Sequence, residues 1–99
     1  MAEAIILEFR DADPALYDAV NKLLGLDPNT GAGVWPEGMV SHVGAAHLDG
    51  SGLTVFEVWE SREAQDAFMT SRLGPALGQA GAPEPTRVEW MNVVGSHTG

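Results

Sequence analysis

Glu57 and Trp59 are the two residues of this sequence whose types and spacing first suggest chemistry. They lie two positions apart in residues 53–60, where β-branched and aromatic residues predict a strand, so their side chains share one face. A carboxylate in an apolar chamber resists ionisation and can act as a general acid or base. An indole beside it offers a flat wall for an aromatic substrate. We predict that Glu57 is catalytic and that Trp59 binds substrate; the alternatives are a paired structural glutamate and a core tryptophan.

His42 is the second catalytic candidate, because a predicted hairpin brings it to the same face. Residues 49–52 (Asp-Gly-Ser-Gly) are typical of a turn, and a four-residue turn there places His42 opposite Trp59. The same register places Gly44 opposite Glu57 and leaves space beside the carboxylate. His42 could then exchange a proton with Glu57. The alternative is a histidine that only packs in the sheet.

The predicted elements follow the order β-α-β-β-α-β, which is the ferredoxin-like motif. Asp13 and Ser61 are expected to cap the two helices, and Gly25 to end the first one. The fold class is therefore α+β, with a four-stranded antiparallel sheet and both helices on one face, in a single domain over residues 1–99. The expected strands are residues 2–10, 39–48, 53–60 and 86–94, and the expected apolar stripe of the first helix is Leu16, Ala19, Val20, Leu23 and Leu24.

The two faces of the sheet receive different predicted roles. The opposite face from the helices, with Val55, Trp59 and Ile6, would hold the chamber, and its apolar content requires a cover. We therefore expect a homodimer formed through the open faces. The set expected under the helices is Thr54, Phe56, Val58, Phe68 and Leu16.

The last strand has two possible parities. We choose Trp90 and Asn92 as its substrate-binding candidates, because they would place an aromatic and an amide side chain in the chamber. The other parity stays open; it would turn Glu89, Met91 and Val93 to that side.

Composition excludes several classes of function. Fourteen acidic residues against five basic ones give a net charge of −9, which disfavours nucleic acid and anionic membranes as partners. No apolar run approaches the roughly 20 residues that span a bilayer. The sequence has no cysteine, which removes thiol chemistry and fits a cytoplasmic protein. His42 and His47 have opposite parity on their strand, so we expect no metal site, and no cofactor is expected either.

Residues 57–61 (Glu-Val-Trp-Glu-Ser), followed by Ala64 and Phe68, resemble the antibiotic-biosynthesis-monooxygenase-like family of dimeric α+β barrels. The predicted element order extends the resemblance over nearly the whole chain. Members include cofactor-independent quinol and polyketide monooxygenases, haem-degrading monooxygenases and small proteins without an assigned reaction. The resemblance implies a homodimer whose sheets close a barrel, and a ligand pocket between each sheet and its helices or loops.

Two departures narrow the activity that the resemblance implies. Haem degraders of this type carry a histidine in the helix after the tryptophan, where this chain has Met69, and an asparagine on the first strand, which has none here. Quinol monooxygenases commonly place a histidine where Phe68 stands. Haem degradation is therefore not expected, and the likeness to quinol enzymes rests on Glu57 and Trp59.

The sequence thus predicts a chamber for a small apolar molecule, aromatic or polyketide-like. If the protein is an enzyme, the predicted reaction is cofactor-independent oxygenation: Glu57 or His42 removes a phenolic proton, the substrate anion reacts with O₂, and Trp59 excludes water. Two alternatives stay open. One is a non-catalytic binding or stress-related dimer, and the other is a cyclase or isomerase that uses the same acid–base pair without oxygen.

Overall fold

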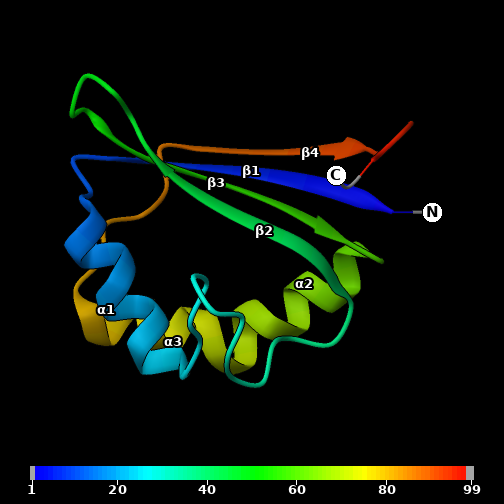
Figure 1. The fold of residues 1–99 in the computed structure, drawn as a ribbon, viewed down its shortest axis with the longest axis horizontal. Helices are drawn as coiled ribbons and strands as arrows, with labels where there is room; N and C mark the ends of the chain where they lie inside the picture. Colours follow the sequence, from blue (N-terminus) through cyan, green and yellow to red (C-terminus); the bar gives the residue numbers. More distant parts are fainter. Residues whose placement is uncertain (1, 98–99) are drawn as a thin grey trace.

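The computed structural model describes residues 2–97, which form a four-stranded antiparallel sheet with helices on one of its faces (Figure 1). The strand order in the sheet is β2-β3-β1-β4, so that β1 and β3 lie in the middle. This arrangement confirms the predicted ferredoxin-like α+β fold. The strands are β1 (Glu3–Arg10), β2 (Met39–Ala46), β3 (Gly52–Trp59) and β4 (Arg87–Asn92).

Capping residues set the ends of the helices, as the sequence predicts. Helix α1 (Pro14–Leu24) begins after Asp13, whose carboxylate accepts a hydrogen bond from the Leu16 amide at 2.8 Å. Gly25 ends α1 in the left-handed conformation, with a φ of 72°. The hydroxyl of Ser61 accepts from the Ala64 amide at 3.2 Å and starts the second helical region. That region contains three consecutive segments: α2 (Arg62–Phe68), η1 (Met69–Leu73) and α3 (Gly74–Ala80).

The segment η1 is a π-helical turn that joins α2 to α3 immediately before Gly74 and Pro75. The amide of Gly74 donates to the carbonyl of Met69, five residues back. Pro75 has no amide hydrogen to continue an α-helical ladder, and a wider turn relieves the contact of its ring with the preceding turn.

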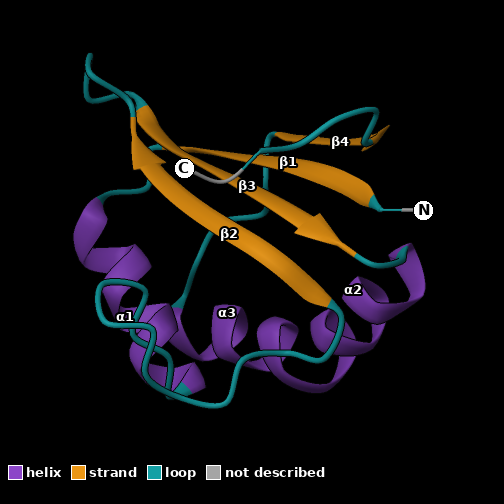
Figure 2. Ribbon diagram, turned by 45° about the vertical axis from the view of Figure 1, so that its right-hand side comes forward, coloured by secondary structure: helices purple, strands orange, loops and turns teal. Residues whose placement is uncertain are grey.

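The helices cover the face of the sheet that carries Val55, Glu57 and Trp59 (Figure 2). Trp59 is fully buried, and its indole packs against Phe68 of α2 at 5.8 Å between ring centroids. Three β3 residues predicted to lie under the helices lie on the open face instead: Thr54, Phe56 and Val58. That prediction is wrong because both faces of β3 carry apolar residues, so periodicity alone does not show which face the helices cover.

The hairpin between β2 and β3 has a longer loop than predicted. Ala46 pairs with Leu53, and the amide of His47 donates to the carbonyl of Gly52 at 2.8 Å. The register is therefore shifted by two residues from the prediction, so His42 lies opposite Glu57 and not opposite Trp59. An even shift keeps every side chain on its face, which is why the predicted grouping of His42 with Glu57 is confirmed.

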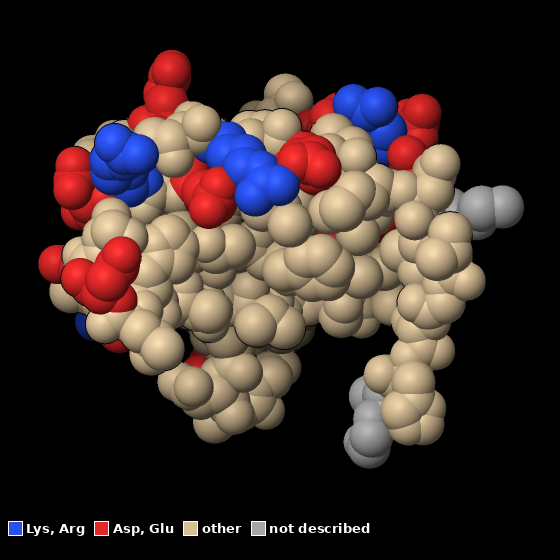
Figure 3. Space-filling view, turned by 90° about the horizontal axis from the view of Figure 1, so that it is seen from above, with Lys and Arg blue, Asp and Glu red and all other residues tan. Residues whose placement is uncertain are grey.

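The open face of the sheet is apolar and uncovered. Val43 and Phe56 form a cross-strand pair on it and are 56% and 38% exposed. In Figure 3, which looks onto this face, charged side chains gather along the upper margin and left end, and uncharged side chains cover the rest. Within residues 2–97, no helix has the length and apolar character required to cross a membrane.

Candidate functional site

A cavity of about 90 Å³ lies between the sheet and the helices. Strands β1, β2 and β3 form its floor, while α1, η1 and α3 provide its walls. Most of its lining is aliphatic or aromatic, and polar side chains are few. The cavity therefore lies where the family resemblance implies a pocket, and not on the open face where the strand periodicity placed the chamber. The polar residues that line it are Tyr17, Asn21, His42 and Glu57.

Glu57 is a carboxylate held in this apolar surrounding by two donors. Its residue is only 3% exposed. One carboxylate oxygen, Oε1, accepts from the indole Nε1 of Trp59 at 3.0 Å. The other, Oε2, lies 2.7 Å from Nδ1 of His42, directly across the β2–β3 ladder. Two strong donors offset the cost of burying the carboxylate.

An irregularity in β2 brings Met39 and His42 to the same face. These residues are three positions apart, so a regular strand would point them to opposite sides. The register shifts by one residue between Met39 and Ser41, as at a β-bulge, so that Met39 pairs with Trp59 and His42 with Glu57. Both side chains consequently reach the cavity.

Tyr17 of α1 extends the hydrogen-bonded chain beyond His42. Its hydroxyl lies 2.5 Å from His42 Nε2, and the two rings are nearly parallel. Burial raises the pKa of Tyr17 above its ordinary value of 10.0; the Asn21 side chain opposes the rise, and the Glu57 charge adds to it. Tyr17 is thus a neutral hydroxyl at neutral pH, at the end of the series Trp59–Glu57–His42–Tyr17.

Gly44 provides the room that Tyr17 occupies. It lies on β2 opposite Val55, and a methyl group on its Cα would come within 2.5 Å of the Tyr17 ring and 2.7 Å of its hydroxyl oxygen. The prediction that Gly44 leaves space beside Glu57 is therefore corrected: the register differs by two residues, and the space is filled by Tyr17.

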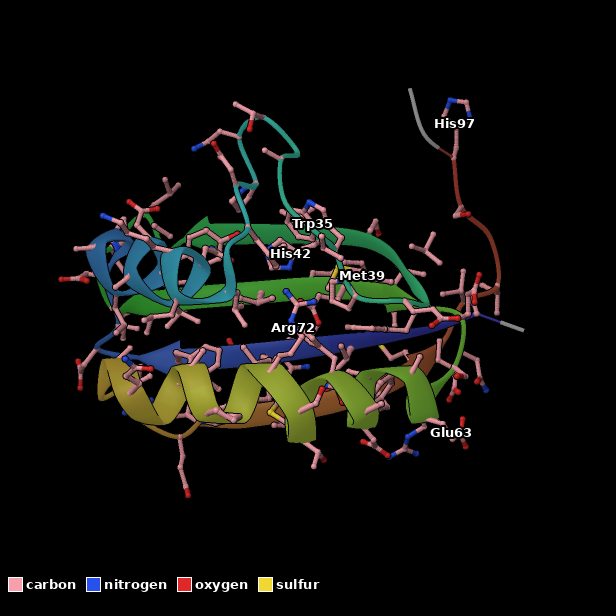
Figure 4. The ribbon with its side chains drawn as sticks, turned by 90° about the horizontal axis from the view of Figure 1, so that it is seen from below. Trp35, Met39, His42, Glu63, Arg72 and His97 are labelled. Carbon is pink, nitrogen blue, oxygen red and sulfur yellow. The ribbon has the colours of Figure 1, made fainter. Side chains whose placement is uncertain are left out.

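The loop between α1 and β2 covers the cavity with Trp35. The Trp35 ring lies 5.9 Å from the imidazole of His42, and its indole nitrogen donates to the Gly31 carbonyl at 3.0 Å. Arg72 of η1 fastens the loop through its guanidinium, which donates to the carbonyls of Val34 at 3.0 Å and Leu24 at 3.1 Å. Figure 4 shows Arg72 pointing toward the group formed by Trp35, Met39 and His42.

The structure separates the five residues that the sequence selects for the site. Glu57 and His42 meet at the cavity, whereas Trp59 lies behind Glu57 in the core and is not among the described residues that line it. Trp90 and Asn92 share the helix-covered face with Glu57, because Trp90 pairs with Ile5.

Neither candidate of β4 reaches the cavity, as far as its lining is described. Trp90 packs against the core, and the Arg62 guanidinium lies 4.9 Å from its ring centre. Asn92 is exposed. The predicted binding roles of Trp59, Trp90 and Asn92, and the catalytic roles of Glu57 and His42, stay predictions.

The sequence reasoning missed Tyr17 and Asn21. The covered side of α1 contains Tyr17 and Asn21 in place of the predicted Ala19 and Leu23, since Asn21 is buried and Leu23 is 45% exposed. The available signal was the spacing of Tyr17 and Asn21, four residues apart on one helical face beside Val20 and Leu24. Two polar residues at that spacing on an apolar border indicate a polar contact with the sheet.

The site has no arrangement typical of a metal centre in the described part of the chain. No group of three or more His, Asp or Glu side chains in residues 2–97 could hold a metal ion.

His47 lies on the hairpin, where its ring nitrogens contact the hydroxyls of Ser51 at 2.9 Å and Thr54 at 2.6 Å.

Known structures with this fold include oxygenases. A candidate antibiotic biosynthesis monooxygenase from Chloroflexus aurantiacus superposes with a TM-score of 0.70 at 20% identity, over 99% of this chain and 98% of that one. A monooxygenase from the gene ActVA-Orf6 of Streptomyces coelicolor, in complex with nanaomycin D, gives 0.60 at 19% identity over 99% and 91%. SnoaB, a cofactor-independent oxygenase from Streptomyces nogalater, gives 0.62 at 14% identity over 96% and 94%.

The comparison is one of structure and not of sequence. No protein-family model matches the chain, and a search of curated proteins found no match. The superpositions nevertheless cover nearly all of this chain and of each neighbour. The resemblance seen in the sequence is thus confirmed for the fold: the chain folds as the antibiotic-biosynthesis-monooxygenase-like proteins do.

Proposed function

We propose that this protein binds a small aromatic molecule in the cavity between sheet and helices and oxygenates it without a cofactor. The observation that carries the proposal is the Glu57–His42 pair, a buried carboxylate and imidazole 2.7 Å apart at an otherwise apolar cavity. An apolar wall binds an aromatic ring, and an adjacent acid–base pair removes its acidic proton. The fold supports this reading, because its neighbours include a cofactor-independent oxygenase.

The proposed reaction needs no electron donor other than the substrate. The pair removes a proton from a phenol or enol, and the resulting anion is electron-rich enough to react with O₂. For a substrate with a reactive CH₂ group, one oxygen atom becomes the new carbonyl oxygen, the other leaves as water, and the four electrons come from the carbon that is oxidised. The apolar lining keeps water away from the anion while it reacts.

We also propose that the chain, as a single domain over residues 1–99, forms a homodimer through the open face of the sheet. Val43, Phe56 and Ile6 lie on this face, and two of them are more than a third exposed. A second copy would cover this surface by facing its own sheet, which buries apolar area on both sides. Light scattering should then give twice the monomer mass; a stable monomer at micromolar concentration would contradict the dimer.

A non-catalytic binding protein is the second candidate, and one observation favours it. Every buried side-chain nitrogen and oxygen atom in residues 2–97 has a hydrogen-bond partner. Glu57 and His42 therefore satisfy each other without a ligand, as structural groups do. Turnover, and not binding, separates the two candidates.

Oxygen uptake with a panel of hydroquinones and anthrones tests the proposal. We expect consumption of one O₂ per substrate. The rate should fall on the order of 10²–10⁴-fold in Glu57→Gln, because an amide cannot act as the acid–base partner of His42. His47→Gln is the matched control, since His47 lies outside the cavity lining. Absence of uptake with every compound, or equal rates in both variants, would reject the oxygenase.

A further inference from the structure

We propose that Tyr17 is a further catalytic residue, whose hydroxyl oxygen takes the proton of the bound phenol or enol while its own proton passes to His42. This inference rests on the proposed function and names the atom that receives the substrate proton. It moves the point of proton abstraction from the Glu57–His42 pair to Tyr17, at the opposite end of the hydrogen-bonded chain from Trp59.

Both ring nitrogens of His42 are engaged, and each carboxylate oxygen of Glu57 already accepts one hydrogen bond. His42 Nδ1 contacts Glu57 Oε2 at 2.7 Å, and His42 Nε2 contacts the Tyr17 hydroxyl at 2.5 Å. Glu57 Oε1 accepts from Trp59 Nε1. A neutral imidazole has two ring nitrogens, so His42 has none left for a substrate. A substrate proton that reaches His42 must therefore pass through Tyr17.

The carboxylate determines the direction of the relay. An ionised Glu57 only accepts hydrogen bonds, so His42 carries its hydrogen on Nδ1 and presents a lone pair at Nε2. The Tyr17 hydroxyl then donates to Nε2 and keeps its own oxygen lone pairs free. Tyr17 is among the residues that line the cavity. We infer that these lone pairs accept from a donor bound there.

The proposed step conserves atoms and charge. The substrate O–H bond breaks as a new O–H bond forms on Tyr17, and the original Tyr17 O–H bond breaks as an N–H bond forms on His42 Nε2. The substrate becomes an anion and His42 a cation, which lies beside the Glu57 carboxylate. No oxidation or reduction occurs in this step. The proton returns along the same path when the product is protonated.

The backbone around Tyr17 is arranged for this contact. The Tyr17 ring packs against β2 where Gly44 has no side chain, since a Cβ there would lie 2.5 Å from the ring. Asn21 donates to the Tyr17 backbone carbonyl at 3.1 Å, one turn along α1. The ring of Tyr17 stacks at 5.9 Å and 11° on the imidazole it bonds. The ring is packed against β2 at Gly44, and its hydroxyl lies at Nε2 of His42.

A purely structural Tyr17 would behave differently when its hydroxyl is removed. Tyr17→Phe keeps the ring and its packing but uncovers Nε2 of His42. If Tyr17 only satisfied His42, the freed nitrogen would take the substrate proton directly, and ionisation of a bound phenol would persist or increase. If Tyr17 is the relay, its hydroxyl donates to the substrate anion after the transfer; Tyr17→Phe removes that donor and leaves the ring between the substrate and Nε2, so the ionised fraction falls.

The test uses 4-nitrophenol, whose anion absorbs visible light, added to the full chain at a pH below the pKa of the free probe. We expect the bound probe to be ionised in the wild type. In Tyr17→Phe the ratio of bound anion to bound neutral probe should fall about tenfold or more, with affinity changed less than the ratio. Gly44→Ala, which displaces the Tyr17 ring and alters no polar atom, should lower the ratio too, while Gly78→Ala, with nothing near its added methyl group, should not.

Each outcome decides one of the two proposals. Binding without ionisation in the wild type, or an equal ratio in Tyr17→Phe and the wild type, overturns the role of Tyr17 and leaves the cavity as a ligand site. If Tyr17→Phe fails to fold by circular dichroism, an unchanged ratio in Gly44→Ala overturns it instead. No binding of the probe to the wild type would count against the ligand cavity itself, and the role of Tyr17 would be rejected with it.

Discussion

The β2–β3 hairpin carries two histidines with nearly the same number of hydrogen bonds and very different surroundings. His42 contacts Tyr17 and Glu57 through its two ring nitrogens, and His47 contacts Ser51 and Thr54 through its own. The first network is buried beneath the helices, whereas the second lies at the open end of the hairpin. Residue type and bond count therefore do not distinguish the two.

The difference lies in what surrounds each ring. His42 has a carboxylate partner that is 4% exposed, a tryptophan above it and an apolar cavity beside it. His47 has neutral hydroxyl partners and is partly exposed at the hairpin loop. A charge formed on His42 would be stabilised by a fixed carboxylate in a medium of low polarity, whereas a charge on His47 would be screened by solvent. The cavity and the buried carboxylate therefore make His42, and not His47, a candidate for catalysis.

Removing the carboxylate should have the largest effect on stability. Glu57→Gln leaves an NH₂ group facing Trp59 Nε1 or His42 Nδ1, so a buried donor loses its acceptor, and the free energy of unfolding should fall by about 2–3 kcal/mol. The matched change in the exposed network, Thr54→Val, should cost less than about 1 kcal/mol. Urea unfolding measures both. Equal losses would mean that the two networks do not differ as proposed.

Filling the space beside Tyr17 should have the next largest effect. Gly44→Ala forces the Tyr17 ring away from β2 and should lower the free energy of unfolding by about 1–2 kcal/mol. Gly78→Ala, in α3 with open space around it, should raise that free energy by about 0.5–1 kcal/mol, because alanine favours a helix. Thermal unfolding of both variants gives the comparison. A neutral Gly44→Ala would contradict the close packing of Tyr17.

Releasing the loop over His42 should have a smaller effect. Arg72→Met keeps the aliphatic stem but removes the bonds to the carbonyls of Leu24 and Val34, which should cost about 1 kcal/mol. Hydrogen exchange should quicken at the Asp27 and Gly31 amides, which are bonded within the loop, while amides of the β2–β3 ladder keep their protection. Unchanged exchange at both loop amides would show that Arg72 does not hold the loop.

Deprotonation of Tyr17 at alkaline pH should have the smallest effect on the free energy of unfolding. The pKa of Tyr17 is raised by burial above 10.0, so the folded chain holds this proton at a pH where the unfolded chain loses it. The contribution is present below 10.0 and is lost as the pH rises through the folded value. Tyr17 is the single tyrosine, so the ultraviolet absorbance of its phenolate reports it alone. A phenolate that forms at or below 10.0 in the folded protein would contradict its burial.

The order of elements and their ends could be predicted from local signals. Asp13, Gly25 and Ser61 act at helix ends as their residue types predict, because caps depend on neighbours within one turn. The grouping of His42 with Glu57 could also be predicted, since parity along a strand survives an even error in register.

The side of the sheet and the role of α1 could not be predicted. Val55 and Phe56 are both apolar, and only the packed helices decide which of them is buried. The irregularity between Met39 and Ser41 breaks the strand period at Val40, a β-branched residue that is typical of a regular strand. The contact of Tyr17 with His42 joins residues 25 positions apart, and it depends on Gly44 having no side chain. Contacts of this kind depend on the assembled fold.

Nitrogen NMR of the histidine rings during addition of 4-nitrophenol tests the proposed Tyr17–His42–Glu57 chain most directly. The sequence has three histidines to compare, His42, His47 and His97. His97 lies in the exposed C-terminal tail and serves as the reference (Figure 4). We predict that the ring nitrogens of His42 shift toward imidazolium values as the probe binds, while those of His47 and His97 stay unchanged. Binding that leaves His42 unchanged, or that shifts His47 as much, would contradict a cavity served by the Tyr17–His42–Glu57 chain.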